Sequence, residues 1–210
     1  MKEILCFGDS NTYGLIPGTT RRYDRETRWT GILAEKLYDK GYRIIEEGLC
    51  GRTSVFDDAT RDGRNGAKVL PILLETHAPL DQVVLMLGTN DCKTYNHASA
   101  DRIGKGIEKL IQQIRKADPA IDILLVSPIE LGEDVWKPGF DLEFDQHSVK
   151  VSKQLKQTYL KIAWKYGCDF LAASDVAKPS KADMEHMNEK GHKNLAKAIE
   201  SFLVEKERNR

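Results

Sequence analysis

Ile-Leu-Cys-Phe-Gly-Asp-Ser-Asn, residues 4–11, joins a continuous apolar run to a polar turn. An apolar run of this length is typical of a strand in a parallel sheet that helices cover on both faces. Gly8 permits the sharp turn that would lift Ser10 off the end of such a strand. The stretch therefore predicts an α/β protein whose first strand ends beside an accessible hydroxyl.

The rest of the chain continues this pattern of strands and helices. Further apolar runs at residues 43–47, 83–87, 121–127 and 168–171 read as strands, which makes five. Apolar side chains at helical spacing separate and follow them, at residues 29–37, 66–77, 103–114, 151–162 and 195–203. Pro71 must either start the second of these helices or kink it. The alternation predicts a doubly wound parallel sheet with right-handed crossovers, whose ligand site lies beyond the carboxyl ends of the strands.

Length and charge limit the classes of protein to consider. With 210 residues and no linker or repeat, we expect one domain over residues 1–210. The formal net charge is zero, so no long-range field attracts nucleic acid or an anionic membrane. No apolar stretch reaches transmembrane length and no secretion signal opens the chain, so we expect a cytoplasmic protein. The scattered cysteines have no metal-ligand spacing, and we expect neither a metal nor a cofactor.

Three residues at the two ends of the chain suggest a serine nucleophile and its base. Asp183 and His186 are three positions apart, so the carboxylate can reach one ring nitrogen of the imidazole. The other nitrogen is then free to face Ser10, which is a weak nucleophile until a base takes its proton. Each feature also has a structural interpretation: a turn at Ser10, and a helix cap at Asp183 or Asn188.

Two further residues follow predicted strands and could stabilise an oxyanion. The side-chain amide of Asn90 and the backbone N–H of Gly51 can donate to the oxygen of a tetrahedral intermediate, with the Ser10 N–H as a third donor. Taken singly, Gly51 could mark a turn, and Asn90 an Asx-turn or a helix cap. Their order along the chain, at successive strand ends, favours the catalytic interpretation.

These residues fall in four blocks that resemble the SGNH (GDSL-type) hydrolase superfamily. The blocks are Gly-Asp-Ser-Asn at 8–11, Gly-Leu-Cys-Gly at 48–51, Gly-Thr-Asn-Asp at 88–91 and Asp-Met-Glu-His at 183–186. Several other stretches resemble the branch of small arylesterases with acyltransferase and perhydrolase activity. They lie at residues 28–31, 45–49, 52–53, 57–58, 65–67, 76–81 and 86–91.

The resemblance implies a flavodoxin-like three-layer α/β/α fold and a role for each block. Ser10 is then the nucleophile, His186 the base and Asp183 its partner, with the Ser10 amide, Gly51 and Asn90 as the oxyanion hole. It also implies short-chain acyl esters as substrates and a homo-oligomer whose interfaces narrow the pocket entrance. Asn11 stands where leucine is common and Tyr13 where the branch often has tryptophan, and we expect both to line the substrate pocket.

The sequence therefore predicts a serine esterase that acts on short-chain aryl or alkyl esters, with acyl transfer to alcohols or peroxide as a second outcome. The nearest alternative is a carbohydrate O-deacetylase with the same triad. A non-catalytic flavodoxin-like module would lack a triad member, and a flavin- or nucleotide-binding protein would carry a Gly-rich loop after the first strand. Two long segments, 14–28 with four arginines and 131–145 with Trp136, are left without an assigned role.

Overall fold

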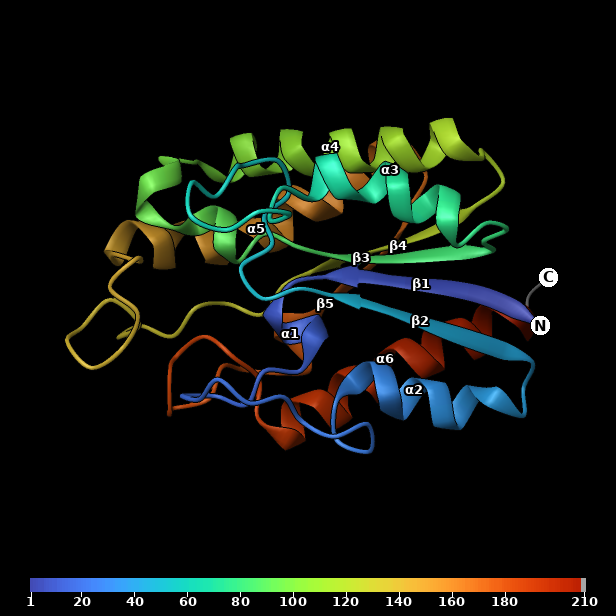
Figure 1. The fold of residues 1–210 in the computed structure, drawn as a ribbon, viewed down its shortest axis with the longest axis horizontal. Helices are drawn as coiled ribbons and strands as arrows, with labels where there is room; N and C mark the ends of the chain where they lie inside the picture. The colour runs from blue at the N-terminus through green and yellow to red at the C-terminus, as the bar shows by residue number, and fades with distance from the viewer. Residues whose placement is uncertain (209–210) are drawn as a thin grey trace.

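The structure, a computed structural model that describes residues 1–208, is built on one five-stranded parallel sheet (Figure 1). The strand order is β2-β1-β3-β4-β5. The strands are β1 (Lys2–Gly8), β2 (Tyr42–Gly48), β3 (Gln82–Met86), β4 (Asp122–Ser127) and β5 (Asp169–Ala172). The predicted α/β class and five-stranded parallel sheet are confirmed, and each observed strand overlaps its predicted run.

Helices cover both faces of the sheet, which gives three layers (Figure 1). One face carries α2 (Trp29–Tyr38) and α6 (Glu189–Arg208), and the other carries α3 (Gly66–Thr76), α4 (Ala100–Ala117) and α5 (Gln146–Tyr166). Short helical turns follow three strands: α1 (Ser10–Tyr13), η1 (Asn90–Cys92) with η2 (Thr94–Asn96), and η3 (Ala173–Asp175). No helix within residues 1–208 combines the length and apolar character that crossing a bilayer requires.

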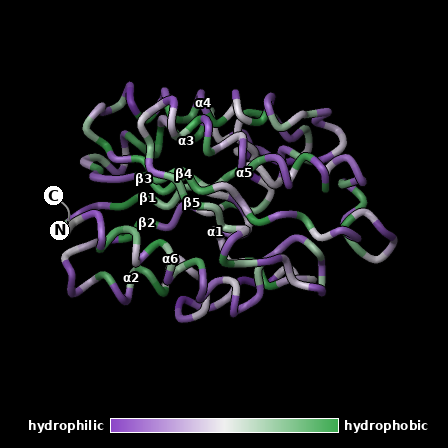
Figure 2. Tube along the Cα trace, turned by 180° about the vertical axis from the view of Figure 1, so that it is seen from behind, coloured by the Kyte–Doolittle hydropathy of each residue, from purple (hydrophilic) through white to green (hydrophobic). Residues whose placement is uncertain are grey.

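The two cores follow from the alternation of side chains along each strand. In β1, Leu5 and Phe7 pack toward α3, α4 and α5, whereas Ile4 and Cys6 pack toward α2 and α6. All four are essentially buried, because helices cover both faces of the sheet. Figure 2 shows the hydrophobic colouring along the central strands. The apolar run in the sequence therefore reflects burial on two faces at once.

Pro71 lies inside α3, not at its start. Proline has no N–H to donate to the carbonyl four residues earlier, so the oxygen of Ala67 loses its helical partner. The side-chain amide of Gln113 in α4 donates to this oxygen at 2.8 Å. The neighbouring helix therefore satisfies the acceptor that Pro71 leaves free.

The ends of α5 explain why it is longer than the apolar pattern at 151–162. Asp145 accepts a hydrogen bond from the Ser148 N–H while Ser148 Oγ accepts from the Asp145 N–H, a reciprocal cap that starts the helix. Gly167 ends it in the left-handed conformation, with φ at 60°. Polar capping residues thus extend the helix beyond the apolar face that predicted it.

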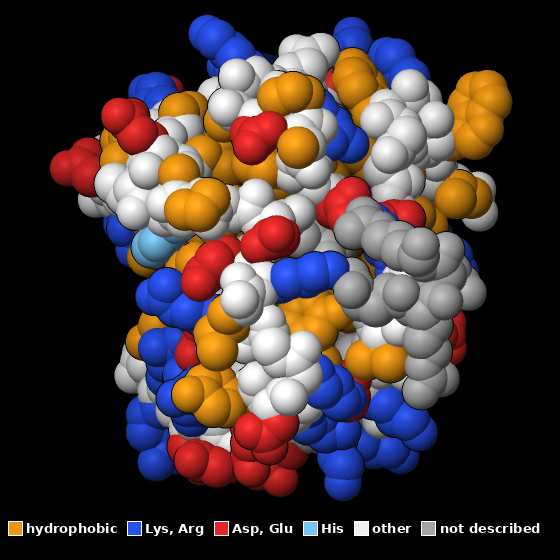
Figure 3. Space-filling view, turned by 90° about the vertical axis from the view of Figure 1, so that its right-hand side faces the viewer, with side chains coloured by type: hydrophobic (Ala, Val, Ile, Leu, Met, Phe, Trp, Pro, Cys, Tyr) orange, Lys and Arg blue, Asp and Glu red, His pale blue; other side chains and the backbone are white. Residues whose placement is uncertain are grey.

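The two ends of the sheet differ in what lies beyond them. Figure 3 looks onto the end where the strands begin, and basic and acidic side chains are mixed there. At the opposite end, α1 follows β1 directly, a turn follows β2, and η1 follows β3 after a short loop. Because β1 lies between β2 and β3, these three segments are neighbours in space.

Candidate active site

Ser10 is fixed at the carboxyl end of β1 as the first residue of α1. The side chain of Asp9 accepts a hydrogen bond from the Asn11 N–H at 3.0 Å and caps this short helix. A methyl group on Gly8 would lie 2.0 Å from Thr12 Oγ1, so only glycine lets the turn close this tightly. Burial raises the pKa of Asp9 to about 7. The local sequence thus places the hydroxyl beyond the strand end.

The imidazole of His186 joins Ser10 to Asp183. His186 Nε2 lies 2.8 Å from Ser10 Oγ, and His186 Nδ1 lies 2.8 Å from Asp183 Oδ2. With Asp183 accepting from the Nδ1 proton, Nε2 is the nitrogen that can accept from the serine. Residues separated by 176 positions in sequence therefore meet in one hydrogen-bonded line.

Asp183 is held as a carboxylate by four donors. Oδ1 accepts from the N–H groups of Glu185 and His186, both at 3.0 Å. Oδ2 accepts from the Gly18 N–H at 2.8 Å in addition to the imidazole. Burial would raise the pKa of Asp183, but its hydrogen bonds and the nearby imidazole outweigh burial and lower it. The group that orients the imidazole is therefore ionised at neutral pH.

The pKa of His186 is raised above its ordinary value. Burial by itself would lower it, because His186 is only 7% exposed. The carboxylates of Glu185 and Asp183 favour the imidazolium and outweigh burial. The same charges would stabilise the imidazolium that forms when the base takes a proton from Ser10.

Two potential oxyanion donors come from the ends of β2 and β3. Gly51 has a left-handed backbone with φ at 82°, and a methyl group there would lie 2.6 Å from Arg61 Nη2. Asn90 is 2% exposed, and its Nδ2 donates to the Arg52 carbonyl at 3.1 Å. An amide nitrogen carries two protons, so this bond fixes the side chain and leaves one N–H free.

Two buried charged residues hold these strand ends together, and neither was predicted as part of the site. Arg52 Nη1 donates to the carbonyls of Gly8, at 2.9 Å, and Glu47, which joins the ends of β1 and β2. Burial lowers the pKa of Arg52 to about 10. Asp91 accepts from Ser54 N and Ser54 Oγ, and burial raises its pKa to about 6. A charged residue beside a glycine or an asparagine gives no sequence signal that it will be buried.

Asn11 and Tyr13, the two predicted pocket residues, have partners within the protein. Asn11 Oδ1 accepts from the Met187 N–H at 2.9 Å, and Asn11 Nδ2 donates to the Glu185 carbonyl at 3.4 Å. Asn11 therefore joins α1 to the loop that carries His186. Tyr13 stacks under the guanidinium of Arg22, at 4.3 Å from the ring centre. Contact of either side chain with substrate stays a prediction.

Two of the four arginines in residues 14–28, Arg22 and Arg28, form ion pairs within the chain. Arg28 Nε and Nη2 donate to the two oxygens of Glu46 at 2.6 and 2.9 Å. Arg22 Nη2 lies 3.5 Å from the same carboxylate. Glu46 thus ties this loop to β2, which accounts for two of its four arginines.

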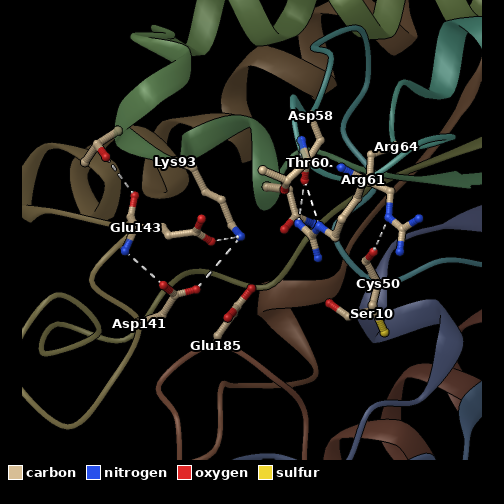
Figure 4. Close-up of polar contacts among 12 residues, drawn as sticks. Ser10, Cys50, Asp58, Thr60, Arg61, Arg64, Lys93, Asp141, Glu143 and Glu185 are labelled. Atoms are coloured by element: carbon tan, nitrogen blue, oxygen red, sulfur yellow. Dashed lines mark hydrogen bonds and ion pairs between the residues drawn. The ribbon is translucent and has the colours of Figure 1, made fainter. Parts of the chain in front are cut away.

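The second long segment, 131–145, reaches the space beside Ser10. Lys93 Nζ lies 2.5 Å from Glu143 and 3.9 Å from Asp141, and it is largely buried. Figure 4 shows Glu185 between this cluster and Ser10, with Arg61 and Arg64 on the other side. The surroundings of Ser10 are therefore rich in charge. Within the described residues, no group of three or more His, Cys, Asp or Glu side chains is arranged to hold a metal ion.

Comparison with known proteins gives a family and several similar structures. Residues 6–193 match the GDSL-like lipase/acylhydrolase family. The native aryl esterase of M. smegmatis is 35% identical, with 98% of this chain and 99% of that chain covered and a TM-score of 0.92. A carbohydrate acetylesterase family member from Sinorhizobium meliloti is 37% identical, with 97% of each chain covered and a TM-score of 0.90. A putative arylesterase from Agrobacterium tumefaciens is 31% identical, with 98% and 99% covered and a TM-score of 0.88. A search of curated proteins found no match.

Proposed function

The chain belongs to the GDSL-like lipase/acylhydrolase family and is a carboxylic ester hydrolase, and from this premise we propose that it cleaves short-chain acyl esters through Ser10, His186 and Asp183. The observation that carries the proposal is the pair of 2.8 Å contacts that His186 makes, one with Ser10 and one with Asp183. The predicted family is confirmed, whereas the triad, the substrate and acyl transfer are the proposal.

In the proposed first step, an acyl-enzyme forms. His186 Nε2 takes the Ser10 proton as Oγ attacks the ester carbonyl, and the carbonyl oxygen becomes an oxyanion. The Ser10 amide, the Gly51 amide and Asn90 Nδ2 would donate to that oxygen. The tetrahedral intermediate then collapses, the bond to the leaving alcohol breaks, and His186 returns the proton to the alcohol oxygen.

The proposed second step releases the acyl group. His186 Nε2 takes a proton from water, an alcohol or a peroxide, whose oxygen attacks the acyl carbon. Collapse of the second intermediate breaks the bond to Ser10 Oγ, which regains its proton from His186. Hydrolysis and acyl transfer differ only in the molecule that enters at this step.

A direct test uses p-nitrophenyl esters together with a covalent probe. Purified protein should hydrolyse the acetate and the butyrate faster than the octanoate. A fluorophosphonate should label the peptide that contains Ser10, as mass spectrometry would show. Turnover without labelling at Ser10, or labelling without turnover, would contradict the proposed mechanism.

Asn90→Ala should slow turnover by about 10²- to 10³-fold, because it removes one oxyanion donor. The loss should appear in kcat with little change in KM, since the oxyanion forms only in the transition state. Asn194→Ala is the matched control: Asn194 Nδ2 donates to the Val176 carbonyl, which has no part in the proposed mechanism, and activity should stay at the wild-type level. Equal activity of Asn90→Ala and wild type would remove Asn90 from the proposed oxyanion hole.

A carbohydrate O-deacetylase is the second candidate. The charged side chains near Ser10, among them Lys93 and Glu185, favour a substrate with several hydroxyl groups. The 37% identity to a carbohydrate acetylesterase family member supports the same substrate class. Competition between an acetylated sugar and p-nitrophenyl acetate would decide between the two candidates, because the better substrate gives the higher kcat/KM.

The homo-oligomer and the cytoplasmic location stay predictions. The outer face of α5 carries two exposed apolar side chains one turn apart, Leu160 and Trp164, the latter 89% exposed. These residues are a candidate contact for a second copy of the chain.

A further inference from the structure

We propose that Glu185 is the binding site for the hydroxyl group of the molecule that takes the acyl group, and that it selects water and vicinal diols over simple alcohols. The proposal rests on the proposed function, because it concerns the release of the acyl group from Ser10. Glu185 stands beside the proposed base in sequence, and apart from its effect on the pKa of His186 the two proposed steps give it no part.

Glu185 lies next to the atom of His186 that transfers the proton. Its Oε1 is 3.8 Å from His186 Nε2, and Nε2 is also the atom that contacts Ser10 Oγ. Figure 4 shows the Glu185 carboxylate on the side of Ser10 that faces Lys93. An incoming molecule must bring its oxygen to Nε2, so it passes within reach of this carboxylate.

The position of Glu185 is fixed by its main chain. Its N–H donates to Asp183 Oδ1 at 3.0 Å, and its carbonyl accepts from Asn11 Nδ2 at 3.4 Å. The residue is 7% exposed. The main chain of Glu185 is thus held by the same side chain, Asp183, that holds His186.

The carboxylate of Glu185 receives no hydrogen bond from the described residues. By contrast, the oxygens of Asp183 together accept four. Burial raises the pKa of Glu185 while the charge of Lys93, which is paired with Glu143 and Asp141, lowers it. Neither Glu185 oxygen is completely enclosed by protein, so a hydroxyl group that enters from solvent can donate a hydrogen bond to this carboxylate.

The 3.8 Å separation fits one oxygen that bonds to both groups. An oxygen at about 2.8 Å from both His186 Nε2 and Glu185 Oε1 would have its two bonds at roughly a right angle, which a water molecule can satisfy. Water carries two O–H groups: one proton goes to His186 as the oxygen attacks the acyl carbon, and the other stays bonded to Glu185. The carboxylate itself gains and loses no proton.

The number of hydroxyl groups therefore decides which acceptors Glu185 assists. Ethanol has one O–H, and it must give that proton to His186, so no donor is left for the carboxylate. Ethylene glycol and sugars carry a neighbouring hydroxyl that can donate to Glu185 while the first one reacts. The site should consequently favour water and vicinal diols over monohydric alcohols.

The test measures how the acetyl-enzyme divides between acceptors. Protein acylated by p-nitrophenyl acetate is offered water with either ethanol or ethylene glycol at equal concentration, and the acetate and ester products are quantified by NMR. Wild type should transfer acetyl to glycol about 10-fold better than to ethanol. Glu185→Met, which has similar size and no oxygen, should lower the rate of hydrolysis by about 10- to 100-fold and bring the two alcohols to equal rates per hydroxyl group. Glu185→Gln keeps one neutral acceptor, so its preference for glycol should lie between those of the wild type and Glu185→Met.

The burst and a control variant distinguish failure of this proposal from failure of the proposed function and from misfolding of the variants. The initial burst of p-nitrophenolate reports acylation of Ser10, and it should persist in both Glu185 variants because this leaving group needs no proton. Glu133→Gln removes an exposed carboxylate paired with Lys153 and should keep the wild-type preference. An unchanged preference for glycol in Glu185→Met or Glu185→Gln with an intact burst would overturn the role of Glu185 alone. Absence of both p-nitrophenolate release and fluorophosphonate labelling at Ser10 in the wild type would overturn the proposed function as well.

Discussion

Replacement of Ser10 by alanine is expected to lower kcat/KM for p-nitrophenyl acetate by about 10⁴- to 10⁶-fold. The hydroxyl is the atom that would form the covalent bond, and it is the oxygen 2.8 Å from the imidazole. The loss should fall on kcat, since substrate contacts elsewhere are unchanged. Fluorophosphonate labelling should disappear together with the burst of p-nitrophenolate.

The fold of this variant should be unchanged. Ser10 is 3% exposed, and alanine fits the same space without its oxygen. Ser201→Ala, on the exposed side of α6, is the matched control and should keep wild-type activity. If Ser10→Ala retained a tenth of the wild-type rate with an unchanged melting curve, another residue would be the nucleophile.

Asp183→Asn is expected to have the second largest effect, about 10⁴-fold in kcat. Asparagine keeps the size of the side chain but can turn its amide N–H groups toward the imidazole. The Nδ1 proton then has no carboxylate to donate to, and Nε2 is no longer held as the acceptor for Ser10. The charge that stabilises the imidazolium is lost at the same time.

The pH dependence of the same variant gives an independent readout. The base must be neutral, so activity falls as the pH drops through the pKa of His186, which is raised above its ordinary value in the wild type. Glu185 and Asp183 both raise this pKa. Removing the Asp183 carboxylate should therefore move the acidic limb of the kcat profile to lower pH. A limb that stays in place or moves upward would contradict the pairing of Asp183 with His186.

Asp175→Asn is the control for Asp183→Asn. Asp175 Oδ1 pairs with Lys156 Nζ at 2.5 Å on the surface, and it makes no contact with the imidazole of His186. Loss of an exposed ion pair changes stability by about 0–1 kcal/mol. Rate and pH profile should match those of the wild type, so an effect confined to Asp183→Asn isolates the role of the imidazole partner.

The strands could be predicted because their signal is local. A strand covered on both faces buries every side chain, so it appears in the sequence as a continuous apolar run, as in β1 and β3. Helix ends were predicted less well, because caps such as Asp145 depend on short polar contacts outside the apolar pattern. Pro71 shows the same limit: its place within α3 depends on Gln113 of another helix.

The sequence alone determined the alternation of strands and helices along the chain. It also determined which chemical groups follow the strands, including Ser10, Gly51, Asn90 and His186. Only the tertiary structure decided which charged groups are buried and what they touch. In the structure, Arg52 joins the ends of β1 and β2 through hydrogen bonds, and the buried Glu185 places its Oε1 3.8 Å from His186 Nε2. The periodicity of apolar residues reflects burial within one segment of the chain. The surroundings of a charged side chain depend instead on residues that are distant in sequence. Asn11 and Glu185, for example, lie 174 positions apart and meet only when the chain folds.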